Sequence, residues 1–221
     1  MTKSPQSYQF ASVAAAHAVT GDAPAPQRDA QPDGKPRAAE RILGAACELF
    51  YRDGIRAVGV DAIVETAGVT KPSLYRSFAS KDELAAAYLR DYEEGFWSRF
   101  EGALARHPAD PRAGLLAYFA GVATRQAATA YRGCALTNAA VEFPEAGSPA
   151  RRVSEANKRR LRQRLEELSS SMGAEEPALL ADGLLMLFEG ANASGQIFGA
   201  DGPARSLAVI ADRLIGASLC R

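Results

Sequence analysis

Histidine and cysteine are scarce in this chain. The 221 residues contain only the histidines His17 and His107 and the widely separated cysteines Cys47, Cys134 and Cys220. There is no CxxC pair and no Cys/His cluster, so neither a structural zinc site nor a disulfide framework is expected. We therefore predict no bound metal and no cofactor, and this cysteine usage fits a reducing cytoplasm.

Net charge, long apolar runs and catalytic motifs are also lacking. Lys plus Arg and Asp plus Glu both total 26, so the formal net charge is zero. Zero net charge argues against a protein that coats nucleic acid through bulk charge, although a local basic surface can still bind DNA. No apolar run approaches the roughly 20 residues of a membrane helix. No Gly-rich phosphate loop or nucleophile motif occurs, so neither a membrane protein nor an enzyme is expected.

The segment 1–36 differs in composition from the rest of the chain. It holds five of the prolines, together with much Ala and Gln. Such a segment cannot bury enough apolar surface to order itself, so we predict a flexible tail. The mildly apolar stretch 10–19 faintly resembles a secretion signal, but His17 and several polar residues interrupt it. A cytoplasmic protein is the preferred interpretation.

Apolar residues recur at helical spacing over the remaining chain, without a repeat or an alternating strand pattern. Hydrophobic residues make up 47%, enough for a sizeable core. The pattern predicts an all-α protein with three domains or segments: the tail 1–36, a three-helix unit 37–84 (called the DNA-reading unit below, for the reasons given next), and a helical second domain 85–221. About nine helices are expected, at 37–53, 60–67, 71–78, 81–100 or beyond, 112–129, 134–142, 149–172, 177–198 and 204–219.

The most informative stretch runs from Val60 to Lys81 and has the form of a helix-turn-helix. Gly68 separates two short helices, and Pro72 suits the first turn of the second one. Ser80 and Glu83 form a capping box that starts the next helix. Two short helices joined tightly through a glycine are typical of proteins that insert the second helix into the DNA major groove.

The second of these helices has an inner and an outer side. Leu74 and Phe78 are expected to pack inward against the helix before it. Short donors, a phenol and cations, the side chains that reach base edges and phosphates, remain outside. Lys81 joins a helix N-terminus, where a lysine and backbone N–H groups can hold a phosphate. The outer residues are Thr70, Lys71, Ser73, Tyr75 and Arg76.

Residues 37–84 resemble the N-terminal domain of the TetR family of transcriptional repressors. The resemblance implies a homodimeric, all-helical regulator that binds double-stranded operator DNA and carries a variable ligand-binding C-terminal domain. It also implies DNA contacts for Thr70, Lys71, Pro72, Ser73, Tyr75, Arg76 and Lys81. The matching residues are Arg41-Ile42-Leu43, Ala46, Leu49-Phe50, Gly54, Val60, Ile63, Ala67-Gly68-Val69, Leu74-Tyr75, Phe78, Lys81 and Leu84.

Two positions depart from the family pattern. Gly59 stands where Ser or Thr usually opens the second helix, so a hydroxyl that could bind phosphate is absent. Gly is still an acceptable N-cap, so folding is little affected. Asp61 lies near the expected DNA side, where its charge is unfavourable. Operator affinity is therefore expected to depend on the third helix, on Lys81 and on the tail 1–36.

The last two expected helices, 177–198 and 204–219, suggest a dimer interface. The first is rich in Gly, Ala and Ser, which let helices approach closely, and the second is apolar on one side. Two such helices per subunit can form a four-helix bundle across a two-fold axis. The alternative is that both helices belong to the core of one subunit.

A pocket for an unknown small-molecule effector is expected among the middle helices. Apolar walls with a few polar groups suit such a ligand. Most of the aromatic candidates could equally be ordinary core residues. The candidates are Phe96, Trp97, Phe100, Tyr118, Phe119, Cys134, Asn138, Glu142, Glu189 and Asn192, with Gln126, Tyr131 and Phe143 as further ones.

Cys134 supports an alternative to ligand release. The stretch from Arg132 to Asn138 resembles a segment of TetR-like C-terminal domains, and some relatives sense electrophiles or oxidants through a cysteine. The alternative for Cys134 itself is a small buried apolar residue. The hypotheses are thus a ligand-released repressor, a redox- or electrophile-sensing repressor, and a helical enzyme that converts a small molecule. Activation instead of repression is also open.

Overall fold

The computed structural model describes residues 37–127 and 130–219, so the predicted tail 1–36 and Cys220 lie outside the described residues. Within the described ranges the chain forms nine α-helices and no strand, which confirms the all-α prediction. The helices are α2 (Ala38–Asp53), α3 (Val60–Ala67), α4 (Lys71–Ser77), α5 (Lys81–Ala105), α6 (Pro111–Gln126), α7 (Ala135–Glu142), α8 (Pro149–Ser171), α9 (Pro177–Phe198) and α10 (Leu207–Ser218).

Two helix boundaries lie three residues from the expected ones, and several others differ by one residue. Helix α6 ends at Gln126, where the sequence pattern predicted 129. The last helix was expected from 204, but two 3-10 turns, η1 (Gly199–Asp201) and η2 (Pro203–Ser206), precede α10. Such turns are common at helix ends because they tighten the last or first turn of the backbone.

The expected local signals start and end the helices that carry the DNA-reading unit. Ser80 Oγ accepts a hydrogen bond from the Glu83 N–H at 3.1 Å, which caps α5. Gly68 adopts the left-handed conformation (φ +62°) and turns the chain between α3 and α4. A residue with a Cβ is strained there, so this glycine is needed for the tight turn.

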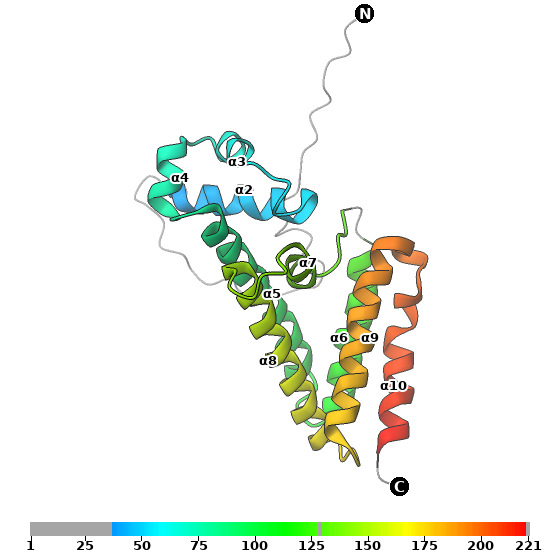
Figure 1. The fold of residues 1–221 in the computed structure, drawn as a ribbon. Helices are drawn as coiled ribbons and strands as arrows, with labels where there is room; N and C mark the ends of the chain where they lie inside the picture. Colours follow the sequence, from blue (N-terminus) through cyan, green and yellow to red (C-terminus); the bar gives the residue numbers. More distant parts are fainter. Residues whose placement is uncertain (1–36, 128–129, 220–221) are drawn as a thin grey trace, which may run out of the picture.

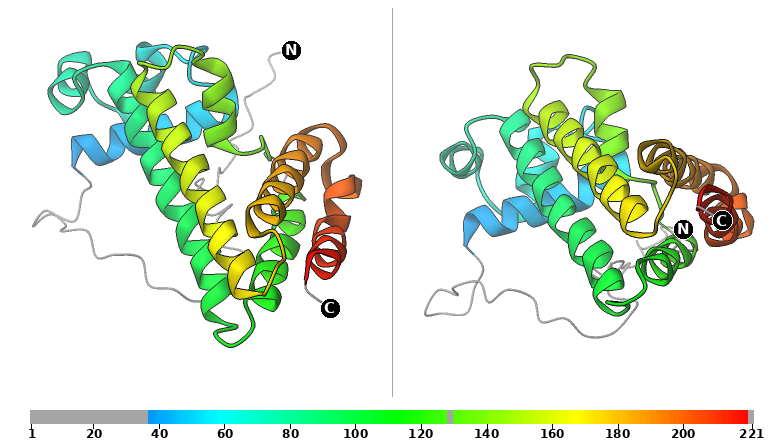
Figure 2. Two further views of the ribbon diagram at one scale, coloured as in Figure 1. Left: turned by 60° about the horizontal axis from the view of Figure 1, so that its bottom comes forward. Right: turned by 90° about the horizontal axis from the view of Figure 1, so that it is seen from below.

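The molecule has a small three-helix unit at one end of a helical bundle (Figure 1). Helices α3 and α4 pack on α2, which packs on the beginning of α5, and α5 then runs the length of the bundle beside α8. Helices α6 and α9 pack next to this pair, and α10 packs on α6 and α9. Seen from below, α9 and α10 form one side of the bundle, away from α2 (Figure 2).

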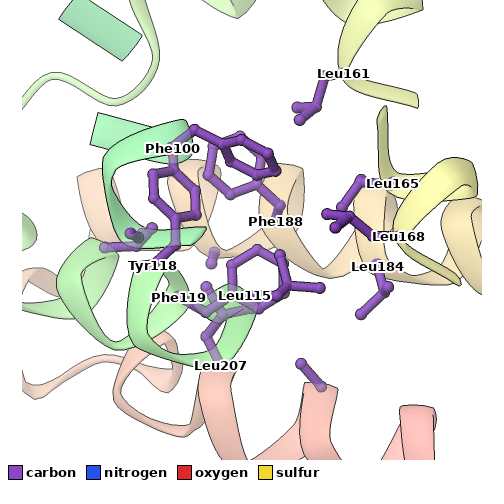
Figure 3. Packing of buried hydrophobic residues seen from close by; sticks show 14 of the residues in the cluster. Phe100, Leu115, Tyr118, Phe119, Leu161, Leu165, Leu168, Leu184, Phe188 and Leu207 are labelled. Carbon is purple, nitrogen blue, oxygen red and sulfur yellow. The ribbon is translucent and has the colours of Figure 1, made fainter. Parts of the chain in front are cut away.

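Buried apolar residues form two clusters. One lies between α5, α6, α8, α9 and α10 and contains most of the large aromatic side chains (Figure 3). The other joins α2, α3 and α4 to the start of α5, and it also includes Cys134, Leu136 and Ala139 from the α7 region. The second cluster therefore extends beyond residues 37–84, because α7 packs into the same core as the DNA-reading unit.

Candidate nucleic-acid interface and effector pocket

Helix α4 presents a polar face to solvent and buries its apolar side. Leu74 is fully buried and Phe78 is partly buried, and both pack with Ile63 and Ala67 of α3. Tyr75, in contrast, is 52% exposed, which is unusual for a large aromatic residue. Of the other predicted DNA contacts on this face, Ser73 is partly buried, and Thr70, Lys71, Pro72 and Arg76 are exposed.

Hydrogen bonds between side chains order this face. Thr70 Oγ1 and Ser73 Oγ lie 3.1 Å apart and share a hydrogen bond. Arg76 donates from Nη2 to the same Ser73 Oγ at 3.1 Å. Since Thr70 is the N-cap of α4, hydroxyl and guanidinium groups gather along the first two turns of this helix. Such donors suit phosphate oxygens and base edges.

Asp61 and Lys71 form an exposed ion pair across the two short helices. Lys71 Nζ lies 2.6 Å from Asp61 Oδ1. The hydrogen bond and the charge of Asp61 raise the pKa of Lys71. An exposed ion pair stabilises the fold little. It does, however, engage the Lys71 ammonium, a cation that is expected to bind a DNA phosphate.

We predict that Asp61→Asn strengthens operator binding. Lys71 would no longer have to break its ion pair with Asp61 before it binds a phosphate. The substitution also removes one negative charge that repels the DNA backbone. We expect affinity to rise by about two- to tenfold at low salt. The slope of log affinity against log salt concentration should become steeper by about one unit, because one more phosphate is contacted. The measurement is a fluorescence-anisotropy titration at several salt concentrations. In a double-mutant cycle with Lys71→Ala most of the gain should disappear; a gain of equal size without Lys71 would contradict this explanation.

Lys81 is partly buried and its ammonium already has a partner. Nζ donates to the carbonyl oxygen of Arg56 at 3.3 Å. Burial lowers the pKa of Lys81, although Asp82 and Glu142 oppose the shift. The same lysine lines a hollow of about 530 Å³ beside Arg56 and the N-terminus of α8. Lys81 is thus held at the junction of the DNA-reading unit with the second domain.

Five of the seven aromatic residues predicted to line an effector pocket gather in one place, whereas Phe143 belongs to the other buried cluster. The five rings pack in the core between α5, α6 and α9 (Figure 3). The centroids of Phe100 and Tyr118 are 4.9 Å apart in an edge-to-face pair, and Phe96 lies 5.2 Å from Trp97. The exposed fractions of Phe96, Trp97, Phe100, Tyr118 and Phe119 are all 7% or less.

Phe188 of α9 completes this cluster, and the sequence analysis did not single it out. Its ring lies 6.0 Å from Phe96 and 6.2 Å from Phe119. The apolar character of 177–198 predicted a buried helix, but nothing in the spacing distinguished this phenylalanine from its leucine neighbours. Only the packing of α9 on α6 brings its ring into the cluster.

Gln126 and Asn192 lie next to the aromatic cluster. Gln126 Nε2 donates to the carbonyl of Ala191 at 2.8 Å, and Tyr131 Oη donates to Asn192 Oδ1 at 2.9 Å. Gln126 Oε1 and the indole Nε1 of Trp97 are buried without a hydrogen-bond partner among the described residues. A ligand group that satisfied such atoms would gain hydrogen bonds that the protein alone does not supply.

Glu189 and Cys134 meet at Lys158, another residue that the sequence analysis did not select. Lys158 Nζ lies 2.6 Å from Glu189 Oε1 and 3.4 Å from Cys134 Sγ. Burial lowers the pKa of Lys158, but Cys134 and Glu189 outweigh it and the net shift is upward. The lysine belongs to a run of basic residues, which hid its inward orientation. Cys134 itself is 3% exposed.

Asn138 and Glu142 lie apart from the aromatic cluster, on the side of α7 that faces α2. Both line a hollow of about 240 Å³ with Phe50 and Tyr51. Asn138 Nδ2 donates to the Arg132 carbonyl at 2.6 Å, and Glu142 accepts from the Arg56 N–H at 2.8 Å. The structure therefore divides the predicted pocket residues between two places.

Helices α9 and α10 expose apolar side chains to solvent. A hollow of about 540 Å³ between them is lined by Met186, Gly190 and Ile210, among others. A Cβ at Gly190 would meet nothing within 4 Å, so this glycine leaves open space, whereas a Cβ at Gly183 would lie 2.9 Å from Leu214. The exposed apolar residues are Leu179, Met186, Ile197, Phe198, Val209 and Ile210.

Two further properties concern the described ranges as a whole. No helix in 37–127 or 130–219 is both long and apolar enough to cross a membrane. The same ranges contain no group of three or more His, Cys, Asp or Glu side chains placed to hold a metal ion.

The fold and the exposed face of α4 define the class of protein: a helix-turn-helix unit joined to a second helical domain. Residues 42–88 match the family model described as bacterial regulatory proteins, tetR family. Among curated proteins, the activator FasR of Mycolicibacterium smegmatis is 42% identical over 64 residues, and the repressor ComR of Escherichia coli is 32% identical over 92 residues. These matches span 29% of FasR and 44% of ComR, less than half of either relative.

Solved structures extend the similarity over the second domain. The putative TetR transcriptional regulator sav143 of Streptomyces avermitilis is 34% identical, with a TM-score of 0.72, over 83% of this chain and 98% of that one. SCO4454 of Streptomyces coelicolor is 29% identical, with a TM-score of 0.73, over 82% and 93%. The chain belongs to the TetR family of transcriptional regulators. This family is one of regulators rather than enzymes.

Proposed function

We propose that the protein is a cytoplasmic homodimeric repressor that binds a palindromic operator and is released from it by a small-molecule effector. The observation that carries the proposal is the exposed face of α4. Tyr75 is half exposed, Arg76 and Thr70 are ordered through Ser73, and Leu74 anchors the helix from behind. A helix held in this way can enter the major groove without losing its own packing.

The exposed face of α9 and α10 supports a dimer. Several large apolar side chains of these helices are exposed, and Met186 and Ile210 line the hollow between them, a feature that monomeric proteins rarely leave open to water. A two-fold axis through this face would unite four helices and give two reading units. Two half-sites about 34–36 Å apart on DNA require two such units.

The aromatic cluster supports effector binding between α5, α6 and α9. Trp97 Nε1 and Gln126 Oε1 are buried without a hydrogen-bond partner among the described residues, which favours a ligand with one or two polar groups on an apolar body. The effector would bind more tightly to a conformation in which the reading units are wrongly spaced. Operator affinity would then fall by at most the ratio of the effector's affinities for the two conformations.

The test of DNA binding is a gel-shift titration with Tyr75→Ala and Lys81→Ala in the full chain. Each variant is expected to weaken operator binding by about ten- to a hundredfold, since each removes one contact of about 1–3 kcal/mol. Loss of a phosphate contact should also flatten the dependence of affinity on salt by about one unit in slope. Unchanged affinity of both variants would refute the assignment.

A specific contact favours a second function, sensing of electrophiles through Cys134. The Lys158 ammonium lies 3.4 Å from its sulfur, so a positive charge is held against the atom that would react. In a conjugate addition, Sγ would bond to the β-carbon of an unsaturated carbonyl compound while the thiol proton passes to the α-carbon. The sulfur is buried, so the reaction requires the segment before α7 to open. A bulky adduct would then hold that segment away from its native position.

We predict that Cys134→Ser separates the two mechanisms. If the cysteine is the sensor, an electrophile such as N-ethylmaleimide releases the wild-type protein from DNA but leaves the Cys134→Ser variant bound. Cys47→Ser is the control, because Cys47 also lies outside any disulfide and is more exposed than Cys134. Release of Cys134→Ser at the wild-type rate would exclude the sensing function and leave ligand release in place.

A further inference from the structure

Both ends of α7 are hydrogen-bonded to the DNA-reading unit. Just before α7, Tyr51 Oη donates to the Gly133 carbonyl at 3.1 Å and accepts from the Arg132 N–H at 3.1 Å. At its last residue, Glu142 Oε2 accepts from the Arg56 N–H at 2.8 Å. The helix between these points has 8 residues. A helix of this length is about 12 Å long, and its two ends contact the end of α2 and the α2–α3 connection.

The Glu142 contact is closely packed. Gly54 has φ +90°, and a Cβ there would lie 3.3 Å from Glu142 Oε1. Arg56 is also held from other sides: its carbonyl accepts from Lys81, and its guanidinium lies 5.2 Å above the Phe143 ring. The connection between α2 and α3 is thus fixed to the C-terminal end of α7, over a sequence separation of 86 residues.

The opposite side of α7 contacts the second domain. Thr137 Oγ1 donates to Glu189 Oε2 of α9 at 2.7 Å, and Glu189 pairs with Lys158 of α8. Helix α7 also shares its apolar core with α2, through Leu136 and Leu49 among others. Any displacement of α8 or α9 relative to α2 must therefore strain or break contacts of α7.

We infer that Tyr51 and Glu142 are positioning residues, which through α7 set the angle of the DNA-reading unit on the second domain. The inference rests on the proposed operator-binding function. Helix α5 connects the two parts at the Ser80 turn and by packing on α2 near its start, and both connections resist bending of the reading unit only close to the axis of α5. A second attachment away from the axis of α5 opposes that bending. In a dimer, this angle decides the separation of the two reading units.

Neither residue is suited to touch DNA itself. The Tyr51 hydroxyl is engaged in both directions, and burial raises its pKa, so it stays neutral. Glu142 carries a negative charge, which phosphates repel. An effect of either residue on operator binding must therefore act through geometry. Its signature is a changed preference for half-site spacing at unchanged affinity for a single half-site.

The experiment uses the full chain and an operator that the wild type selects from random-sequence duplex DNA. Affinities are measured for this operator, for versions with one or two base pairs added or removed between half-sites, and for an isolated half-site. The variants are Tyr51→Phe, which keeps the ring stacked on Tyr92, and Glu142→Gln, which removes the charge. Thermal melting identifies a variant that fails to fold, and the other variant then carries the test.

We expect Tyr51→Phe to lose about three- to tenfold of the preference for the selected spacing, the size of one net hydrogen bond. Glu142→Gln should lose a smaller part of it, because its amide oxygen still accepts from the Arg56 N–H but without the charge that strengthens the bond. Affinity for the half-site should remain at the wild-type value. Glu145→Gln is the matched control, because its ion pair with Arg56 is exposed on both sides and should change little. Wild-type spacing preference in both folded variants overturns the inference, and so does an equal loss on every DNA. If the wild type selects no duplex, the proposed function itself fails.

Discussion

Ile210→Asp is expected to produce monomers and to abolish operator binding at physiological salt. Ile210 is 44% exposed in the single chain and lines the apolar hollow between α9 and α10. A two-fold interface contains the substituted residue twice, so two carboxylates would be buried in an apolar surface. Burial of one unpaired charge already costs several kcal/mol. We expect dimerisation to weaken by about a thousandfold or more.

Sedimentation velocity over a concentration series measures this effect, and a gel shift on the same samples measures operator binding. Val141→Asp is the control, since Val141 is 79% exposed on α7 and lies outside the α9–α10 face. Val141→Asp should remain dimeric. A dimeric Ile210→Asp variant would mean that the subunits meet elsewhere.

Phe100→Ala is expected to destabilise the fold by about 3–5 kcal/mol, the usual range for a buried phenylalanine. Its ring is fully buried and makes edge-to-face pairs with Tyr118 and Trp97. The cavity left behind lies among rings from several helices, which cannot all move into it. Chemical denaturation followed by circular dichroism gives the free energy of unfolding.

Tyr75→Ala is the matched control for this loss. It also removes an aromatic ring, but one that is 52% exposed, so we expect a change within about 0.5 kcal/mol. If Phe100→Ala left the free energy of unfolding unchanged, the ring would line a ligand pocket and would not contribute to the core. A large loss identifies Phe100 as part of the core, whatever ligand binds beside it.

The DNA-reading unit could be recognised from sequence because its signals are local. Gly68, Ser80 and Glu83 act on backbone within a few residues, and they form the turn and the cap that the sequence predicts. Leu74 and Ile63 lie close in sequence and pack together as their spacing indicates. The exposed face of α4 follows from the same periodicity, because residues on one side of a helix recur at fixed intervals.

The second domain was predicted less completely. Its helices were found from apolar periodicity, but their neighbours depend on contacts between distant segments. Five of the aromatic candidates pack in one cluster with Phe188, which was missed, whereas Phe143 and Glu142 lie elsewhere, beside the DNA-reading unit. Whether any of these residues binds an effector stays a prediction. Lys158 could not be distinguished from the neighbouring basic residues, because helical spacing alone does not reveal which side chains pack against it.

The sequence by itself determined the helical class, the helix-turn-helix and the family resemblance, since periodicity, turns and caps are short-range properties of the chain. The tertiary structure decided what connects the reading unit to the rest. Tyr51 meets Gly133 across 82 residues, and Arg56 meets Glu142 across 86. Hydrogen bonds at such separations leave no periodic trace in a sequence, because they form only after α2, α5 and α7 have packed around one core.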